Sequence, residues 1–178
     1  NKKILVALDL GTKTGIATFG LDGQLIKRYT AQFDRDSQAQ NLFNLLRGFL
    51  TPNMIVAWEE PFGKYGQHVM QRLVGAVQCA CELIGCDDVP MNVVTIKKHA
   101  TGYGLASKDH MIIAAKTKWG GEEWDEHQAD ACWIGQAAQE LVLDTQPTKE
   151  NDDVKRVLIN MLAEICGSLI FATLFWFV

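Results

Sequence analysis

The sequence lacks the features of a secreted, repetitive or zinc-binding protein. Its five cysteines form no CxxC pair and stand apart from any histidine cluster at zinc spacing, which favours a reducing compartment. No internal repeat or low-complexity tract is present. We expect no signal peptide, because the first apolar run has only strand length before Asp9 interrupts it. At 178 residues and 48% hydrophobic content, the chain is long enough for one well-buried domain, which we expect in the cytoplasm.

Positive charge is also scarce overall. The chain has 17 Lys and Arg against 21 Asp and Glu, a formal net charge of -4, which argues against a protein that coats nucleic acid by bulk electrostatics. Residues 91–118 depart from this average, because they hold five lysines and one acid. The lysines are Lys97, Lys98, Lys108, Lys116 and Lys118. Local phosphate contact and an ordinary solvated surface both fit this excess.

The first apolar run ends in a carboxylate. Residues 4–8 are aliphatic at every position, which predicts a strand buried on both faces, and Asp9 follows directly. Gly11 and Gly15 permit a tight reversal into a second strand at 16–19. A buried acid needs hydrogen bonds, a cationic partner or a metal ion. Asp9 could therefore belong to a site, or it could only satisfy the amides of the turn.

The rest of the domain alternates strands and helices around a predicted five-stranded mixed sheet. We expect strands at 24–33, 54–58 and 91–96, and helices at 37–50, 68–85, 107–119 and 122–143. The first three strands would form an antiparallel meander. The strand at 54–58 repeats the arrangement of the first, because Glu59 follows an apolar run. If these two strands are neighbours in one sheet, Asp9 and Glu59 lie side by side.

The last predicted helix adds two metal-competent groups. His127 and Asp130 are three residues apart and share a face that is apolar farther along. An apolar face packs on the sheet, so both side chains would point towards Asp9 and Glu59. Three carboxylates suit Mg²⁺ or Mn²⁺ rather than zinc, and two such ions about 4 Å apart can clamp a phosphodiester. His127 could alternatively face solvent at the start of the helix.

Three segments resemble a known nuclease family. They are Ala-Trp-Glu-Glu-Pro-Phe at 57–62, the block at 96–108 that ends Gly-Tyr-Gly-Leu-Ala-Ser-Lys, and His-Gln-Ala-Asp-Ala at 127–131. With the order of the elements, they are similar to the RuvC family of Holliday junction resolvases, of the ribonuclease H-like superfamily, over residues 3–143. The resemblance implies an α/β ribonuclease H-like fold, with helices on both faces of the sheet. It also implies a metal-dependent endonuclease that resolves four-way DNA junctions in recombination, repair or phage DNA processing.

The resemblance also implies roles for single residues. Asp9, Glu59, His127 and Asp130 would hold two Mg²⁺ or Mn²⁺ ions per active site and act in catalysis together with Lys108. DNA would be bound by Lys97, Lys98, Lys108, Phe62 and Tyr103, with Phe62 stacked near the crossover. Two copies would form a homodimer, with the helix at 68–85 at the interface. The chain departs from the family at Asp-Leu-Gly-Thr, where bacterial members commonly have Asp-Pro-Gly, and at His127, where many have an acid.

Other interpretations remain open. A ribonuclease H-like nuclease could act on RNA or on other branched DNA, and a junction binder could lack catalysis altogether. The Asp-Leu-Gly-Thr loop also looks like the first phosphate loop of actin-like ATPases and sugar kinases, but those proteins close two such domains over ATP and this chain is predicted to hold one.

The C-terminal part has a different character from the predicted domain at 1–143. A polar linker is expected at 144–153 and an apolar helix at 154–178. Within it, 157–178 is a run of 22 residues whose only charge is Glu164. That length can span a bilayer, although Asn160 and Glu164 would be costly in lipid. We therefore expect either a membrane-associated anchor or a helix that packs on the domain or a dimer partner.

Overall fold

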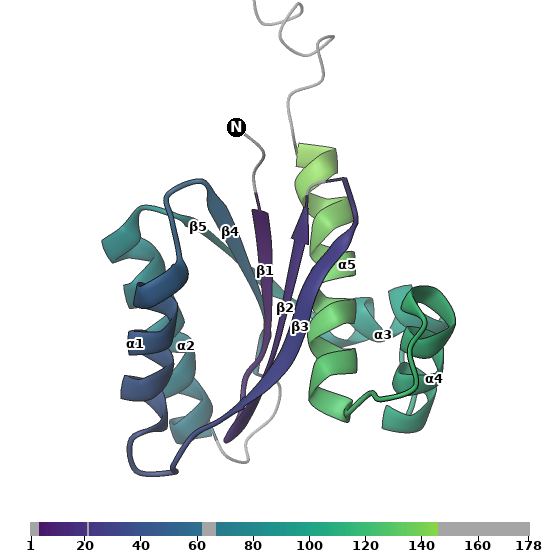
Figure 1. The fold of residues 1–178 in the computed structure, drawn as a ribbon, viewed down its shortest axis with the longest axis horizontal. Coiled ribbons are helices and arrows are strands. Elements are labelled where there is room, and N and C mark those ends of the chain that lie inside the picture. The colour runs from purple at the N-terminus through teal and green to yellow at the C-terminus, as the bar shows by residue number, and fades with distance from the viewer. Residues whose placement is uncertain (1–3, 21, 62–66, 146–178) are drawn as a thin grey trace, which may run out of the picture. The chain divides into compact units, whose positions relative to one another are not determined.

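Five strands form one mixed sheet in the computed structural model, which describes residues 4–20, 22–61 and 67–145. The strands are β1 (Ile4–Asp9), β2 (Lys13–Gly20), β3 (Leu25–Gln32), β4 (Met54–Glu59) and β5 (Asp87–Met91). Their spatial order is β3-β2-β1-β4-β5. The first three are antiparallel, as the sequence predicts, and β4 and β5 run parallel to β1 (Figure 1).

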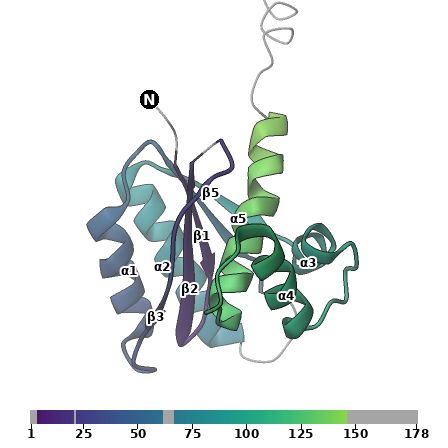
Figure 2. The same cartoon turned by 45° about the vertical axis from the view of Figure 1, so that its right-hand side comes forward.

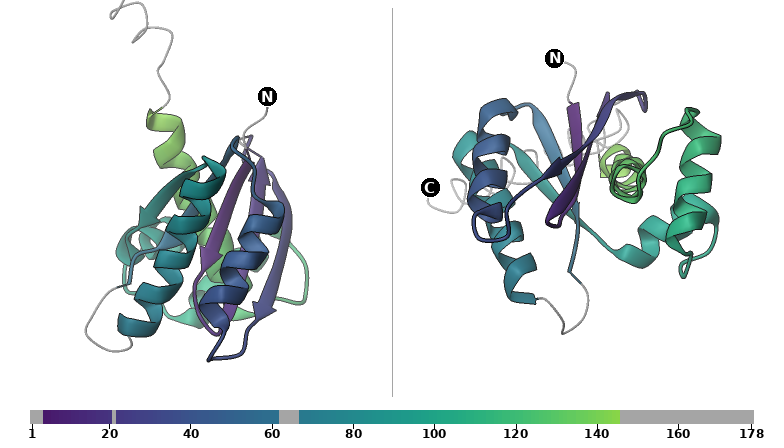
Figure 3. Two further views of the ribbon diagram at one scale, coloured as in Figure 1. Left: turned by 90° about the vertical axis from the view of Figure 1, so that its left-hand side faces the viewer. Right: turned by 60° about the horizontal axis from the view of Figure 1, so that its bottom comes forward.

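Helices cover both faces of this sheet (Figures 1 and 2). One face is covered by α1 (Gln38–Phe49) and α2 (Gln67–Ile84), which lie side by side in Figure 3. On the other face lies α5 (Glu126–Thr145), with α3 (Val93–Thr101) and α4 (Lys108–Trp119) beyond it. The predicted α/β class, with a five-stranded mixed sheet between helices, is confirmed.

The two faces of the sheet carry separate sets of buried side chains. Towards α1 and α2, alternate positions of β1 and β4 carry Val6, Leu8, Val56 and Trp58, which pack in one buried cluster with Leu42, Leu46, Leu73 and Val77. The intervening positions carry Leu5, Ala7, Ile55 and Ala57, which are also buried. Because residues two apart on a strand share a face, Asp9 and Glu59 project from the face of Ala7 and Ala57, the one that α5 covers.

A glycine in α5 permits close packing on that face. A Cβ atom at Gly135 would lie 2.4 Å from the Phe19 ring and 3.1 Å from the Cβ of Ala7. Both neighbours are fully buried, so neither can move aside without disturbing the core. The absent side chain of Gly135 therefore sets how near α5 lies to β1 and β2.

The fifth strand lies earlier than predicted. The strand expected at 91–96 is found at Asp87–Met91, and the residues after it form α3. The β-branched run Val93-Val94-Thr95-Ile96 is typical of strands, but the side chain of Asn92 accepts a hydrogen bond from the Val94 N–H at 2.9 Å and caps a helix there. The cap and the burial of Ile96 on one helix face outweigh local strand propensity.

Other helix limits agree more closely. Ser107 caps α4 as predicted, accepting from the backbone N–H of His110 at 3.4 Å. The final helix begins at Glu126 rather than 122 and continues to Thr145 rather than 143. The remainder of the predicted linker and the whole apolar segment at 154–178 lie outside the described residues. Among the helices that are described, none has the length and apolarity needed to cross a membrane, and the anchor at 154–178 stays a prediction.

Replacing Gly135 with Ala is expected to destabilise the fold. The new methyl group would overlap the Phe19 ring, and overpacking costs about 1–3 kcal/mol, which the gain of about 1 kcal/mol in helix propensity only partly offsets. We expect the free energy of unfolding, measured by urea denaturation, to fall by up to about 2 kcal/mol.

Gly75→Ala provides the matched control. Gly75 lies inside α2, and a Cβ there would have no heavy atom within 4 Å among the described residues. This variant is expected to gain up to about 1 kcal/mol. Equal stabilisation of both variants would show that α5 does not pack on β1 and β2 in this way.

Candidate functional site

Two carboxylates meet where adjacent parallel strands end. β1 pairs with β4 in a register that places Leu8 opposite Trp58, so Asp9 and Glu59 occupy the next positions on neighbouring strands. Both project from the face that α5 covers. The sequence prediction that these two acids lie side by side is thus confirmed as geometry, and it follows from the two apolar strands being adjacent.

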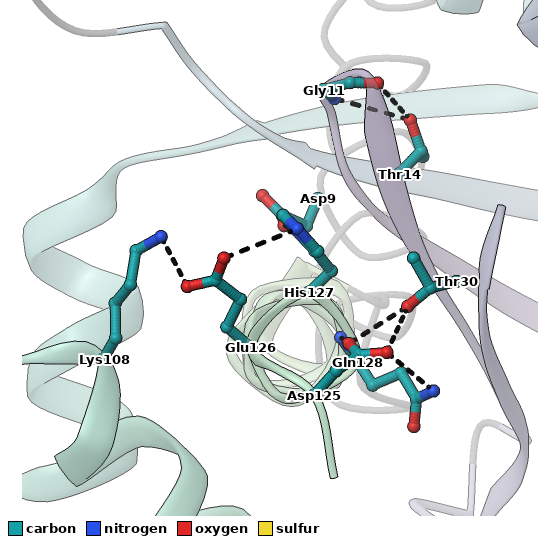
Figure 4. Close-up of polar contacts among 9 residues, drawn as sticks. All are labelled: Asp9, Gly11, Thr14, Thr30, Lys108, Asp125, Glu126, His127 and Gln128. Carbon is teal, nitrogen blue, oxygen red and sulfur yellow. Dashed lines mark hydrogen bonds and ion pairs between the residues drawn. The ribbon is translucent and has the colours of Figure 1, made fainter. Parts of the chain in front are cut away.

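Helix α5 brings His127 to Asp9. The Nδ1 atom of His127 lies 2.8 Å from Oδ2 of Asp9, and the two side chains are 23% and 20% exposed (Figure 4). This contact depends on Gly15, which pairs with Asp9 in the β1–β2 ladder. A Cβ atom at Gly15 would stand 1.9 Å from the carbonyl oxygen of His127. Glycine therefore lets the backbone of α5 rest directly on β2.

A network of polar side chains fixes the start of α5 on β3. The Asp125 carboxylate accepts hydrogen bonds from the Gln128 backbone N–H and from the Thr30 hydroxyl, each at 2.8 Å, as Figure 4 shows. The Gln128 side chain donates to Asp125 at 3.1 Å and accepts from Arg28. This network is not among the features predicted from the sequence. The one hint of it in the sequence is Asp125, a residue type favoured at helix N-caps.

A chain of charges joins Lys108 to His127. The Nζ atom of Lys108 lies 2.6 Å from Oε2 of Glu126, and Oε1 of Glu126 lies 3.6 Å from Nε2 of His127 (Figure 4). Lys108 is 68% exposed, so the pair contributes little to stability. It does hold the first residue of α4 beside the first turn of α5. No separate role was predicted for Glu126 from the sequence.

Asp9, Glu59, His127 and Lys108 line one pocket with a volume of about 600 Å³. Its acidic and imidazole groups are Asp9, Glu59, His127 and Asp130, and its basic groups are Lys13, Arg35, Lys97 and Lys108. All four predicted metal-binding residues are therefore brought together, as are two of the predicted DNA-binding lysines.

Two other predicted DNA-binding residues, Lys98 and Tyr103, lie outside this pocket. Lys98 is exposed on α3 and is not part of the pocket lining. Tyr103 is 60% exposed and borders a separate hollow with His110 and Ile113. Phe62 lies outside the described residues, so its predicted stacking role stays a prediction.

The carboxyl groups of the pocket are difficult to ionise together. Burial and repulsion from Asp9 and Glu59 raise the pKa of Asp130 to about 7. Burial also raises the pKa of Glu59, helped by the charge of Asp9. For Asp9, burial raises the pKa more than the contact with His127 lowers it. That hydrogen bond in turn raises the pKa of His127 above its ordinary value of 6.5.

The donor set suits a hard divalent cation. Clustered carboxylates are oxygen ligands of the kind that Mg²⁺ and Mn²⁺ prefer, and a cation would relieve their mutual repulsion. Within the described residues, however, no three His, Cys, Asp or Glu side chains form a group arranged to hold an ion, and Asp9 is engaged by His127. The residue types fit a metal, but these side chains would have to rearrange to bind it.

Comparison with known proteins shows a likeness of fold. No protein-family model matches the chain, and no curated protein matches it. A Thermus thermophilus RuvC structure matches with a TM-score of 0.67 and 19% identity, over 80% of this chain and 97% of that one. T. thermophilus RuvC in complex with Holliday junction substrate matches with a TM-score of 0.66 and 18% identity, over 80% and 96%. The predicted RuvC-like, ribonuclease H-like fold is confirmed.

Asp9→Asn is expected to lower the pKa of His127 in the metal-free protein. The substitution removes the carboxylate that stabilises the imidazolium form, while the burial that disfavours that form remains. NMR titration of the His127 ring protons in the intact chain measures this pKa. Asp109→Asn is the matched control, because Asp109 is an exposed acid on α4 that does not line the pocket. An unchanged His127 titration in Asp9→Asn would contradict the contact.

Proposed function

We propose that this protein is a divalent-metal-dependent endonuclease that resolves four-way DNA junctions by hydrolysing phosphodiester bonds. One observation carries the proposal: Asp9, Glu59, His127 and Asp130 line a single pocket at the end of β1 and β4. The support from comparison is a fold shared with RuvC, one structure of which holds a Holliday junction substrate. A role in recombination, repair or phage DNA processing in the cytoplasm belongs to the same proposal.

The four residues of the pocket would hold two Mg²⁺ ions, or Mn²⁺. When bound, such ions lower the pKa of water and stabilise charge on a phosphodiester. Asp9 would be oriented by its place at the end of β1 and by His127, whose Nδ1 atom lies 2.8 Å from the Asp9 carboxylate. Asp130 and His127 come from one turn of α5, so the placement of that helix on β2 positions both.

Lys97 and Lys108 would contact the phosphates of the substrate. Both line the pocket, and the charge of Lys97 offsets part of the rise in the pKa of Glu59 that burial and Asp9 cause. Lys108 is largely exposed and reaches the site from α4, where Glu126 holds its ammonium group 2.6 Å away. The ammonium can then stabilise negative charge on the cleaved phosphate. Lys98, Tyr103 and Phe62 would extend the DNA contact beyond the pocket.

Removing any one acid of the pocket is expected to abolish Mg²⁺-dependent cleavage. Asp9→Asn, Glu59→Gln and Asp130→Asn each delete an anionic ligand while keeping the side-chain volume, so junction binding should be largely retained. A cleavage panel of four-way junction, flap, duplex and RNA substrates measures the activity, and gel-shift assays measure binding. A chelator should stop cleavage by the wild type.

Asp109→Asn is the matched control and should cleave as the wild type does. Cleavage retained in all three pocket variants would remove the proposed metal site. Preferred cleavage of RNA or flaps would reassign the substrate. Tight junction binding without divalent-dependent cleavage would identify a non-catalytic binder.

We further propose that the active form is a homodimer in which α2 contributes to the interface. Val69 and Leu83, both on α2, are 48% and 63% exposed, so this helix offers aliphatic side chains that a second copy would cover. Leu83→Glu is expected to reduce the mass measured by light scattering from dimer to monomer. Ile113→Glu on α4, where Ile113 is 60% exposed, is the control. A monomeric wild type would contradict this assembly.

A further inference from the structure

The pocket has two cations for which neither the predicted motifs nor the proposed mechanism accounts. Lys13 is the first residue of β2, and Arg35 lies in the connection between β3 and α1. Both line the pocket that contains the carboxylates. They lie outside the lysine-rich stretch at 91–118, and an isolated basic residue forms no pattern from which a binding site could be predicted.

The backbone holds these two positions together. Lys13 pairs with Gln32 in the β2–β3 ladder, and the Phe33 N–H donates to the carbonyl oxygen of Thr12 at 2.9 Å. The β1–β2 turn and the end of β3 are therefore linked just before Arg35. Lys13 and Arg35 form one basic flank on this linked backbone.

The strand order places this flank on the side of the carboxylates away from α3. Asp9 and Glu59 end β1 and β4, which lie between β2 and β5 in the sheet. Lys13 belongs to β2, whereas Lys97 belongs to α3, which follows β5. The acids thus have basic residues on both sides, in a chain whose net charge is -4.

The charges of this flank are available to a ligand. Lys13 and Arg35 are both exposed, and within the described part of the chain neither forms an ion pair. Lys108, on the opposite flank, is already paired with Glu126. Guanidinium and ammonium groups beside a hollow recognise phosphate oxygens by charge and hydrogen bonding.

We propose that Lys13 and Arg35 bind the DNA backbone on the β2–β3 side of the carboxylates. The DNA strand then crosses the pocket between this basic flank and the one formed by Lys97 and Lys108. The identity of the ligand as DNA rests on the proposed function. The ligand class is the phosphodiester backbone next to the cleaved bond, and the contacts are to phosphates rather than to bases.

The salt dependence of DNA binding tests this directly. Binding of the full chain to a four-way junction and to a linear duplex is measured between about 50 and 200 mM salt in EDTA, which prevents cleavage. Lys13→Ala and Arg35→Ala should each reduce the slope of log affinity against log salt by about 0.9, and the double variant by about twice that. The ratio of the affinity at about 50 mM salt to that at about 200 mM salt should then be about 3-fold smaller for each residue removed.

Matched variants separate lost charge from lost structure. Lys13→Arg and Arg35→Lys keep the charge and should keep the slope. Lys27→Ala and Arg47→Ala remove exposed cations that do not line the pocket, so the slope of log affinity against log salt should not change. Lys97→Ala removes a cation that does line the pocket and should reduce that slope. Unfolding midpoints should be unchanged throughout, because both tested side chains are exposed.

The outcomes distinguish this inference from the proposed function. An unchanged slope in the folded double variant, with junction-selective binding intact, overturns the second flank and leaves the proposed function standing. A reduced slope on duplex DNA without any preference for junctions supports the flank and removes junction resolution. Absence of binding to both DNAs by the wild type overturns both.

Discussion

The site depends on the direct contact between the first turn of α5 and β2. Gly15 has no side chain, so the carbonyl group of His127 can lie where a Cβ atom would otherwise stand, and the imidazole reaches Asp9 across a separation of 118 residues. Gly135 permits the same approach farther along the helix. The distance between helix and sheet is thus set by two missing side chains, and it decides whether His127 and Asp130 meet the strand-end acids.

This arrangement has an electrostatic cost. Three carboxyl groups share a partly buried pocket, and their pKa values are raised by burial and, for Glu59 and Asp130, also by neighbouring charge. Such a group of acids is unfavourable for folding alone, and buried groups with perturbed pKa values are typical of functional sites. The four cations of the same pocket supply opposite charge at its rim, so the site combines metal-competent acids with phosphate-competent bases.

The spacing of apolar residues predicted the features of the site that the sheet positions. The apolar runs before Asp9 and Glu59 fixed two strands and the acid at the end of each, and the three-residue spacing of His127 and Asp130 placed both on the sheet-facing side of α5. Prediction failed where one polar residue decides the backbone: Asn92 caps a helix in a β-branched run. It also failed for residues that only tertiary contacts bring in. Arg35 reaches the pocket through the link between Phe33 and Thr12, and Glu126 is joined to two residues of the pocket, Lys108 and His127.

Asp125 accepts hydrogen bonds from Thr30 and from the first turn of α5. These bonds fix the start of α5, and with it the site, independently of the segment that precedes the helix. Since the helix start is held by β3, the connection through Gly120 and Gly121 does not have to position His127. The connection is itself tied to the same strand, because Arg28 donates to the Glu123 carbonyl oxygen at 2.9 Å and lies over the Trp124 ring. A change at Asp125 would thus have to be matched at Thr30 for the helix start to stay on β3.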